Sequence, residues 1–316
     1  MLKPAFSSDE FVRMKLVLAT KVVGMMGRKL EEDDWTDAYC QAKNIPRSNW
    51  SNLNIDINYQ GLGVEIKLYR VKSSHKESIK ENCGTTKMHP AATRSIRIDS
   101  SLSAEDAKNS VLKQYAELII DRTNKVKDAS NRQVADMRSA WVLWEPELRE
   151  FLYFEEEMFI PNPQNYFAEW NITKARGSRK ESKSLWIYDK KTKLKRYSVT
   201  TDAGAKIQPY FDIPAASDPN LYYFRVQSEM LSDSDIGLWV SQLTAQRLEK
   251  LVDIHDKQKL SEFLLTSIKD FAVDNTSVEP EYAVCLTVNN DAYEALITTL
   301  QGVSDEHNMQ LFLKYL

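Results

Sequence analysis

The feature that most constrains this fold is a pair of short apolar segments joined by a glycine-containing turn. Residues 53–59 (LNIDINY) and 63–71 (GVEIKLYRV) both have strand character, and two glycines lie near the turn between them. This pattern predicts a β-hairpin. Side chains in a strand alternate between its two faces, so Glu65 and Lys67 share one face while Val64 and Ile66 point into the core.

The position of the turn decides where Asp56 lies. A two-residue turn of Gly61 and Leu62 would be of type II′ and would pair Gln60 with Gly63. Counting outward, Asp56 then lies opposite Lys67, and directly opposite residues share a face. The hairpin therefore predicts that Asp56, Glu65 and Lys67 meet on one surface. A change of one residue in loop length would move Asp56 to the other face.

Two carboxylates and an ammonium group on one surface are typical of metal-assisted phosphodiester hydrolysis. Asp56 and Glu65 offer the hard oxygen ligands that Mg²⁺ prefers, so both are candidate metal ligands. Lys67 is suited to orient the attacking water and to stabilise negative charge that develops on phosphate. The structural alternative is an exposed strand face with an ordinary Glu/Lys pair. Other acid-x-Lys strings occur at 106–108, 181–183 and 189–191, but none follows an acid on a neighbouring apolar strand.

The remaining pattern predicts a mixed α/β chain. We expect helices at 9–29, 32–43 and 104–126, strands at 141–144, 151–159 and 221–227, and a hairpin at 184–201. The end of the stretch CGTTKMHPAATRSIRI is a further candidate strand. After Ser228 we expect two helices within 235–272, then a short strand and helices within 282–316. These patterns divide the chain into residues 1–227 and a mainly helical region, 228–316.

The composition excludes several classes of protein. The 316 residues, 42% of them hydrophobic, can form one large domain or two smaller ones. Cys40, Cys83 and Cys285 are scattered, which disfavours a disulfide framework or a zinc site and fits a reducing cytoplasm. There is no apolar run of membrane-spanning length, so we expect no membrane partner. A nucleotide-binding enzyme is disfavoured because there is no P-loop or GxGxxG motif.

Charge is unevenly distributed although the net charge is only -3. Residues 174–206 contain 11 Lys and Arg against 3 Asp and Glu, whereas residues 228–316 contain 6 against 15. The basic segment is a candidate phosphate-contacting surface. The acidic region should repel DNA, so we expect it to pack or to form a dimer contact. Both segments also fit ordinary solvated faces.

With Asp56, Glu65 and Lys67 in this arrangement, the sequence resembles the PD-(D/E)XK nuclease superfamily, and within it the type II restriction endonucleases. The resemblance covers about residues 9–160 and implies a core of helix, hairpin, ExK strand, helix and strand, in an α+β mixed sheet flanked by helices. Ile55 stands where the motif has proline. The CGTTKMHPAATRSIRI stretch and residues 185–214 also resemble these enzymes. The resemblance implies double-stranded DNA as substrate, Mg²⁺ as cofactor and a homodimer.

Other residues are weaker candidates. Glu32 is a candidate helper acid, although acids are also common where a helix starts. The candidate DNA contacts are His89, Thr93, Arg94, Arg97, Lys174, Arg176, Arg179, Lys180, Lys193 and Lys195. Among these, Arg176 and Arg179 are suited to reading guanine, and the lysines to phosphate. The alternatives are a turn packed on the core around His89 and a solvated hairpin edge around the lysines. Trp186 and Tyr188 share a face and are expected in the core.

Two competing functions stay open. One is a modification-dependent endonuclease that holds a flipped base in an aromatic pocket, with aromatic residues near Trp170, Trp186 and Tyr210. The other is a DNA-binding module without catalysis, in which the Glu65/Lys67 face is incidental. Comparing cleavage of methylated and unmethylated DNA would distinguish the first function from a restriction enzyme. Mg²⁺-dependent cleavage would exclude the second.

Overall fold

The computed structural model describes residues 2–46, 55–71, 77–90, 96–175, 181–201, 206–267 and 283–316. Its helices are α1 (Ser8–Met25), α2 (Glu32–Ala42), α3 (Ala104–Ser130), α4 (Gln242–Glu249), α5 (Lys257–Ser267), α6 (Asn290–Leu300) and α7 (Asp305–Lys314), with 3₁₀ turns η1 (Ile79–Asn82) and η2 (Pro163–Asn165). Its strands are β1 (Ile57–Tyr59), β2 (Leu62–Arg70), β3 (Thr86–Met88), β4 (Asp136–Trp144), β5 (Glu150–Glu157), β6 (Tyr166–Thr173), β7 (Ser182–Asp189), β8 (Lys195–Thr200), β9 (Ile207–Asp212), β10 (Tyr222–Arg225), β11 (Glu229–Met230), β12 (Asp235–Ser241) and β13 (Ala283–Asn289).

The first sheet is mixed and has the order β1-β2-β4-β5-β10. β1 and β2 form the predicted hairpin, and the connection from β2 through α3 returns to β4, which runs parallel to β2. β5 and β10 extend the sheet with antiparallel pairing. The register places Glu65 level with Ser139, and Lys67 level with Trp141. The prediction of a mixed sheet flanked by helices is confirmed.

Helices α1 and α2 cover one face of this sheet. Val64 and Ile66 of β2 are buried in the same cluster as Trp35 and Tyr39 of α2. The start of α1 is fixed by Ser7, whose hydroxyl accepts a hydrogen bond from the Glu10 backbone N–H while the Glu10 carboxylate accepts from the Ser7 N–H, a capping box. None of the helices among the described residues has both the length and the apolar character needed to cross a membrane.

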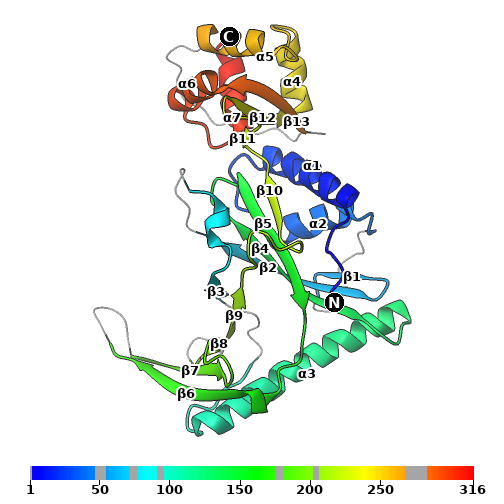
Figure 1. The fold of residues 1–316 in the computed structure, drawn as a ribbon, viewed down its shortest axis with the longest axis vertical. Helices are drawn as coiled ribbons and strands as arrows, with labels where there is room; N and C mark the ends of the chain where they lie inside the picture. Colours follow the sequence, from blue (N-terminus) through cyan, green and yellow to red (C-terminus); the bar gives the residue numbers. More distant parts are fainter. Residues whose placement is uncertain are drawn as a thin grey trace.

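A second sheet has the order β3-β9-β8-β7-β6 and lies beside the long helix α3 (Figure 1). Leu185 and Ile187 of β7 pack against Val111 and Leu112 of α3 in a shared cluster. The predicted hairpin of residues 184–201 is confirmed as β7–β8. Its turn is held by Asp189, whose carboxylate accepts hydrogen bonds from the backbone of the following residues. Strand β3 comes earlier in its stretch than predicted, and residues 96–99 form no strand.

The chain after Ser228 forms a three-stranded sheet, β11-β12-β13, surrounded by α4 to α7, with its own buried cluster. The sequence prediction is wrong at residues 235–241, which form β12 and not helix. The run Ile236–Val240 is short and wholly apolar, so its periodicity does not separate helix from strand. Pairing with the distant strand β13 decides it.

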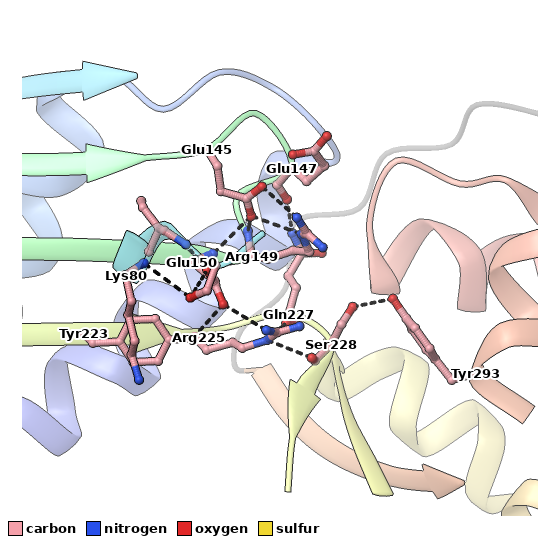
Figure 2. Close-up of polar contacts among 12 residues, drawn as sticks. Lys80, Glu145, Glu147, Arg149, Glu150, Tyr223, Arg225, Gln227, Ser228 and Tyr293 are labelled. Carbon is pink, nitrogen blue, oxygen red and sulfur yellow. Dashed lines mark hydrogen bonds and ion pairs between the residues drawn. The ribbon is translucent and has the colours of Figure 1, made fainter. Parts of the chain in front are cut away.

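Helix α7 is buried on every side from Asp305 to Leu313 even though its first turns are polar. The carboxylate of Asp305 accepts hydrogen bonds from the backbone N–H groups of Ser228 and Trp239, at 2.8 and 3.3 Å. The Ser228 hydroxyl also lies 2.6 Å from the Tyr293 hydroxyl (Figure 2). These contacts lie within residues 228–316, so part of the acidic character of this region is used in internal packing. The Asp305 N–H also donates to Gln227 Oε1 at 3.1 Å, and this contact joins the two regions of the chain.

On the other side of this junction, Glu150 is buried at the start of β5. It accepts hydrogen bonds from the Ile79 N–H at 2.6 Å and the Tyr223 hydroxyl at 2.7 Å, and it pairs with Arg225 at 2.9 Å (Figure 2). Burial alone would raise the pKa of Glu150, but these donors hold that pKa below its ordinary value. A buried carboxylate matched by such a set of donors is well explained as a structural contact.

Candidate active site

The hairpin turn differs from the predicted one. Tyr59 pairs with Leu62, so the turn consists of Gln60 and Gly61, with φ of 50° and 87°. Positive φ at both central residues is the pattern of a type I′ turn, whose backbone twist suits a hairpin. A Cβ atom on Gly61 would lie 2.8 Å from the side chain of Arg132, which is exposed and can move, so glycine is needed here for its conformation.

The predicted grouping of Asp56 with Glu65 and Lys67 does not depend on this error. The observed pairing ends at Ile57–Val64, and extending it by one residue would bring Asp56 level with Glu65, whereas the sequence predicts Asp56 opposite Lys67. The pairing is therefore displaced by two residues along β2. Because side chains repeat their face every two residues, Asp56 keeps the predicted face.

Two contacts place these three side chains around β2. The Ile66 backbone N–H, which lies between the other two residues, donates to Asp56 Oδ2 at 2.5 Å. Lys67 Nζ lies 2.6 Å from Glu65 Oε1. Glu65 is only 7% exposed, although it is charged. The structure therefore brings together two carboxylates and a lysine in a largely buried setting, as the sequence predicts.

Arg122 on α3 is a member of the site that the sequence analysis does not identify. Its Nη2 lies 3.3 Å from Glu65 Oε1. Its Nε is buried and has no hydrogen-bond partner among the described residues. A signal is present in the sequence, because Arg122 follows Tyr115, Leu118 and Ile119 at helical spacing and so continues the buried stripe of the helix. A cation on such a stripe needs a buried partner.

The electrostatics of Asp56 are unusual. Burial, reinforced by repulsion from Glu65, raises its pKa to about 7, although Lys67 and the Ile66 amide act in the opposite direction. Burial would lower the pKa of Lys67, but the attraction of Glu65 and Asp56 is stronger and raises it. Lys67 therefore stays charged at neutral pH, while Asp56 is close to its point of ionisation.

Glu32, the candidate helper acid, begins α2 with an exposed side chain. Partial burial of its carboxyl group raises its pKa; repulsion from Glu65 and Asp33 adds to this effect and attraction to Lys67 opposes it. Glu32 therefore lies within electrostatic range of the site. Among the described residues, no group of three or more His, Cys, Asp or Glu side chains is close enough to form a metal cage.

The donor set fits Mg²⁺ better than a metal that needs a complete protein cage. Mg²⁺ is usually held by one or two carboxylates, with water and substrate phosphate completing its shell. Asp56 and Glu65 provide two such groups. The contacts described above use Asp56 Oδ2 and Glu65 Oε1, so they involve one oxygen of each carboxylate. Asp56 and Glu65 are therefore the residues that would hold such an ion.

Several predicted DNA contacts are placed by the structure. His89 is buried, with Nε2 3.2 Å from the Leu68 carbonyl and its ring beside Trp141, which favours the packed-turn alternative. Arg97, Lys174 and Lys193 are exposed, and Lys195 is half-buried. The remaining candidates Thr93, Arg94, Arg176, Arg179 and Lys180 lie outside the described residues.

The aromatic residues of the second sheet lie on two different faces. Trp170 is on the face that packs against α3, and its indole N–H donates to the Leu102 carbonyl. Trp186 and Tyr188 are half-buried on the opposite face, while Leu185 and Ile187 between and beside them are buried. The expectation that Trp186 and Tyr188 belong to the core is therefore wrong.

Scans against protein-family models, curated proteins and solved structures found no match for this chain. What the site can do is therefore judged from its own side-chain geometry.

Proposed function

We propose that this protein is a Mg²⁺-dependent endonuclease that hydrolyses phosphodiester bonds in double-stranded DNA, with Asp56, Glu65 and Lys67 as its centre. The observation that carries the proposal is the contact set around β2, where two partly desolvated carboxylates adjoin one lysine. Asp56 is poised to ionise near neutral pH, which suits a group that must exchange a proton for a cation.

Each residue has a role that its position supports. Asp56 and Glu65 would bind the metal ion, and the chemistry that Mg²⁺ supplies when bound is polarisation of the scissile phosphate and acidification of water. Lys67, charged at neutral pH, would orient the attacking water and stabilise the negative charge that develops on phosphorus oxygens. Arg122 holds Glu65 in place, and its buried Nε–H is suited to a phosphate oxygen.

The fold supports the same proposal. Helices, the β1–β2 hairpin with the Glu65/Lys67 strand, helix α3 and strand β4 follow in the order that the PD-(D/E)XK resemblance implies. Helix α3, which connects β2 to β4, carries Arg122 and lies beside the face of β2 that bears Glu65. A type II restriction enzyme is the form of nuclease that we propose. A homodimer would supply two centres related by a two-fold axis, one for each strand of a palindromic site.

The test is a cleavage assay with plasmid and phage DNA, in Mg²⁺ or in EDTA. Half of the DNA comes from a cytosine-methylating host, so that modification-dependent cleavage is detected. Glu65→Ala and Lys67→Ala are compared with Lys191→Ala, a matched control in which an exposed lysine of another acid-x-Lys string is removed. Circular dichroism establishes that each variant is folded.

We expect discrete fragments with Mg²⁺ that disappear in EDTA and in both site variants but persist in Lys191→Ala. Fragments from methylated DNA alone would assign the modification-dependent function. Folded wild-type protein that cuts none of these DNAs, or a Glu65→Ala variant that cuts as well as the wild type, would refute the proposed centre.

A further inference from the structure

The second sheet presents a groove on the face that α3 does not cover. The groove has a volume of about 570 Å³. The residues of its lining that matter for binding are Asn171, Trp186, Lys195, Lys206, Gln208 and Tyr210. The strand register places these side chains on one face of the sheet. Trp186 of β7 lies level with Ser198 of β8, which in turn lies level with Gln208 of β9.

Lys195 lies at the centre of the aromatic part of the groove. Its Nζ is 3.0 Å from the centroid of the Trp186 ring, and 5.8 Å from those of Tyr188 and Tyr210. A β-bulge between Ile187 and Tyr188 makes Tyr188 pair with Lys195 instead of Arg196. Bulges re-aim side chains in this way, and here the bulge turns the Lys195 ammonium onto the groove face.

The described lining of the groove contains more cations than acids. Among the described residues no Asp or Glu lines it, and Lys195 and Lys206 contribute cations. Burial lowers the pKa of Lys195, with no carboxylate contributing to the shift. The nearest acid in the sheet register is Glu169, which is level with Trp186 on the same face, is exposed and does not line the groove. Lys183 is engaged elsewhere, since its Nζ donates to the Ser100 carbonyl. The groove therefore favours an anionic ligand.

An aromatic ring beside polar side chains and lysines that make no ion pair with the described residues is the combination that binds unpaired nucleotides, since bases stack on the ring and phosphates contact the cations. The amide groups of Asn171 and Gln208 offer donors and acceptors for base edges. The volume of the groove is on the scale of a small-molecule site. The fit is to one nucleotide and not to a whole duplex.

We propose that this groove binds a single unpaired or extruded nucleotide of the DNA substrate, with its base stacked on Trp186 and its phosphate contacted by Lys195 and Lys206. This inference rests on the proposed function for its substrate class, DNA. The base would displace the Lys195 ammonium from the Trp186 ring, and the ammonium would then contact the phosphate next to it. Non-covalent contacts alone are involved.

The test measures binding without cleavage, in EDTA, by fluorescence anisotropy. The probes are a fluorescein-labelled, fully paired duplex and the same duplex with one extra unpaired thymidine. The variants are Trp186→Ala, Trp186→Phe, which keeps an aromatic ring, and Lys195→Ala. Lys191→Ala is the control, because it removes the same charge from the exposed turn of the same hairpin. Competition with heparin, a polyanion without bases, measures the part of DNA binding that is purely electrostatic.

We expect the bulged duplex to bind about tenfold more tightly than the paired one, which is the scale of one base stacked on an aromatic side chain. Trp186→Ala should abolish this preference, Trp186→Phe should keep most of it, Lys195→Ala should weaken binding of the bulged probe, and Lys191→Ala should leave the preference unchanged. Equal affinity for the two probes, or a preference that survives in folded Trp186→Ala, would overturn the proposal.

The cleavage assay on the same preparations separates this inference from the proposed function. Mg²⁺-dependent cleavage that is lost in Glu65→Ala, together with equal affinity for the two probes, would reject the groove alone. A Trp186-dependent preference in a protein that cuts no DNA would support the groove and reject the nuclease.

Discussion

Replacing Asp56 by asparagine should stabilise the fold at neutral and alkaline pH while abolishing cleavage. The pKa of Asp56 is about 7 in the folded protein, against 3.8 for an ordinary aspartate. Below pH 3.8 the carboxyl group is protonated in both folded and unfolded chains, so its burial does not lower the free energy of unfolding. Between these values the unfolded chain releases the proton while the folded chain keeps it, so stability falls as pH rises and levels off above about pH 7.

The size of the effect follows from the same two values. Each pKa unit is worth roughly 1.4 kcal/mol, so the full loss has an upper limit of about 4 kcal/mol. Relaxation around the partly buried group reduces this, and we expect a gain for Asp56→Asn of about 2 to 3 kcal/mol at pH 8. The gain should be small at pH 4. Asparagine keeps an oxygen that can accept from the Ile66 N–H, so no hydrogen bond need be lost.

The assay is urea unfolding of wild type and Asp56→Asn in metal-free buffers from pH 4 to pH 8, followed by circular dichroism. Asp34→Asn is the control with the opposite sign. Asp34 is partly buried, which would raise its pKa, but its hydrogen bonds to Arg28 and to the Glu31 N–H lower it. Relative to wild type, Asp34→Asn should therefore be less stable by a nearly constant amount from pH 4 to pH 8, because the stabilisation by ionised Asp34 is complete above the ordinary aspartate pKa. A gain for Asp56→Asn that does not change between pH 5 and pH 8, or a loss at pH 8, would refute the placement of Asp56 beside Glu65.

The same geometry makes other predictions. Single-turnover cleavage should rise about tenfold per pH unit up to about pH 7 and then level off, because Asp56 must be ionised to bind a cation. Addition of 10 mM Ca²⁺, which binds oxygen ligands, should raise the melting temperature of the wild type in a thermal shift assay but not that of Glu65→Ala. Arg122→Ala should slow single-turnover cleavage about a hundredfold. Arg122→Lys should retain more activity, because lysine restores a positive charge facing Glu65 and the phosphate. Ser7→Ala should cost about 1 kcal/mol in urea unfolding by removing the cap of α1, without changing cleavage.

Local signals explain which parts of the fold can be predicted from the sequence. The hairpin at Asp56–Lys67 and helices α1 and α2 carry periodicity, turn and cap signals within a few residues of one another. Helix α1 nevertheless ends at Met25, four residues earlier than predicted, because Met26 and Gly27 adopt positive φ. The predicted turn of the hairpin is wrong by one residue because Gly61 and Gly63 offer two alternatives that only the backbone geometry separates.

Elements decided by distant contacts cannot be predicted in the same way. The sequence predicts helix where β12 forms, because the partner of this strand, β13, lies more than 40 residues further along the chain. Strands β6 and β9 are absent from the prediction, and β9 contains Pro209, which has no N–H to donate and so weakens a strand prediction. The polar residues of α7 have the composition of a solvent-facing turn of helix. They are buried because Asp305 accepts backbone hydrogen bonds from other elements.

The site is predictable where it depends on one hairpin and unpredictable where it depends on packing. Asp56, Glu65 and Lys67 follow from strand alternation alone, and an error in register of two residues leaves their face unchanged. Arg122 requires knowledge that α3 lies against the Glu65 side of β2. Its position on the buried stripe of a predicted helix indicates that it has a buried partner, but the sequence does not indicate which acid that partner is.

The pKa of Asp56 bears on the choice between a catalytic centre and an ordinary ion-pair cluster. In a purely structural cluster, Asp56 is a poor residue, because its ionised form is destabilised by burial and by Glu65, and asparagine would keep the Ile66 hydrogen bond without that penalty. A divalent cation reverses the balance, since it binds the ionised carboxylates and removes their mutual repulsion. A residue that weakens the metal-free fold at neutral pH and is stabilised by an added cation would be explained by function and not by packing. The sign of the stability change in Asp56→Asn, measured with and without a divalent cation, therefore distinguishes the two interpretations independently of any cleavage assay.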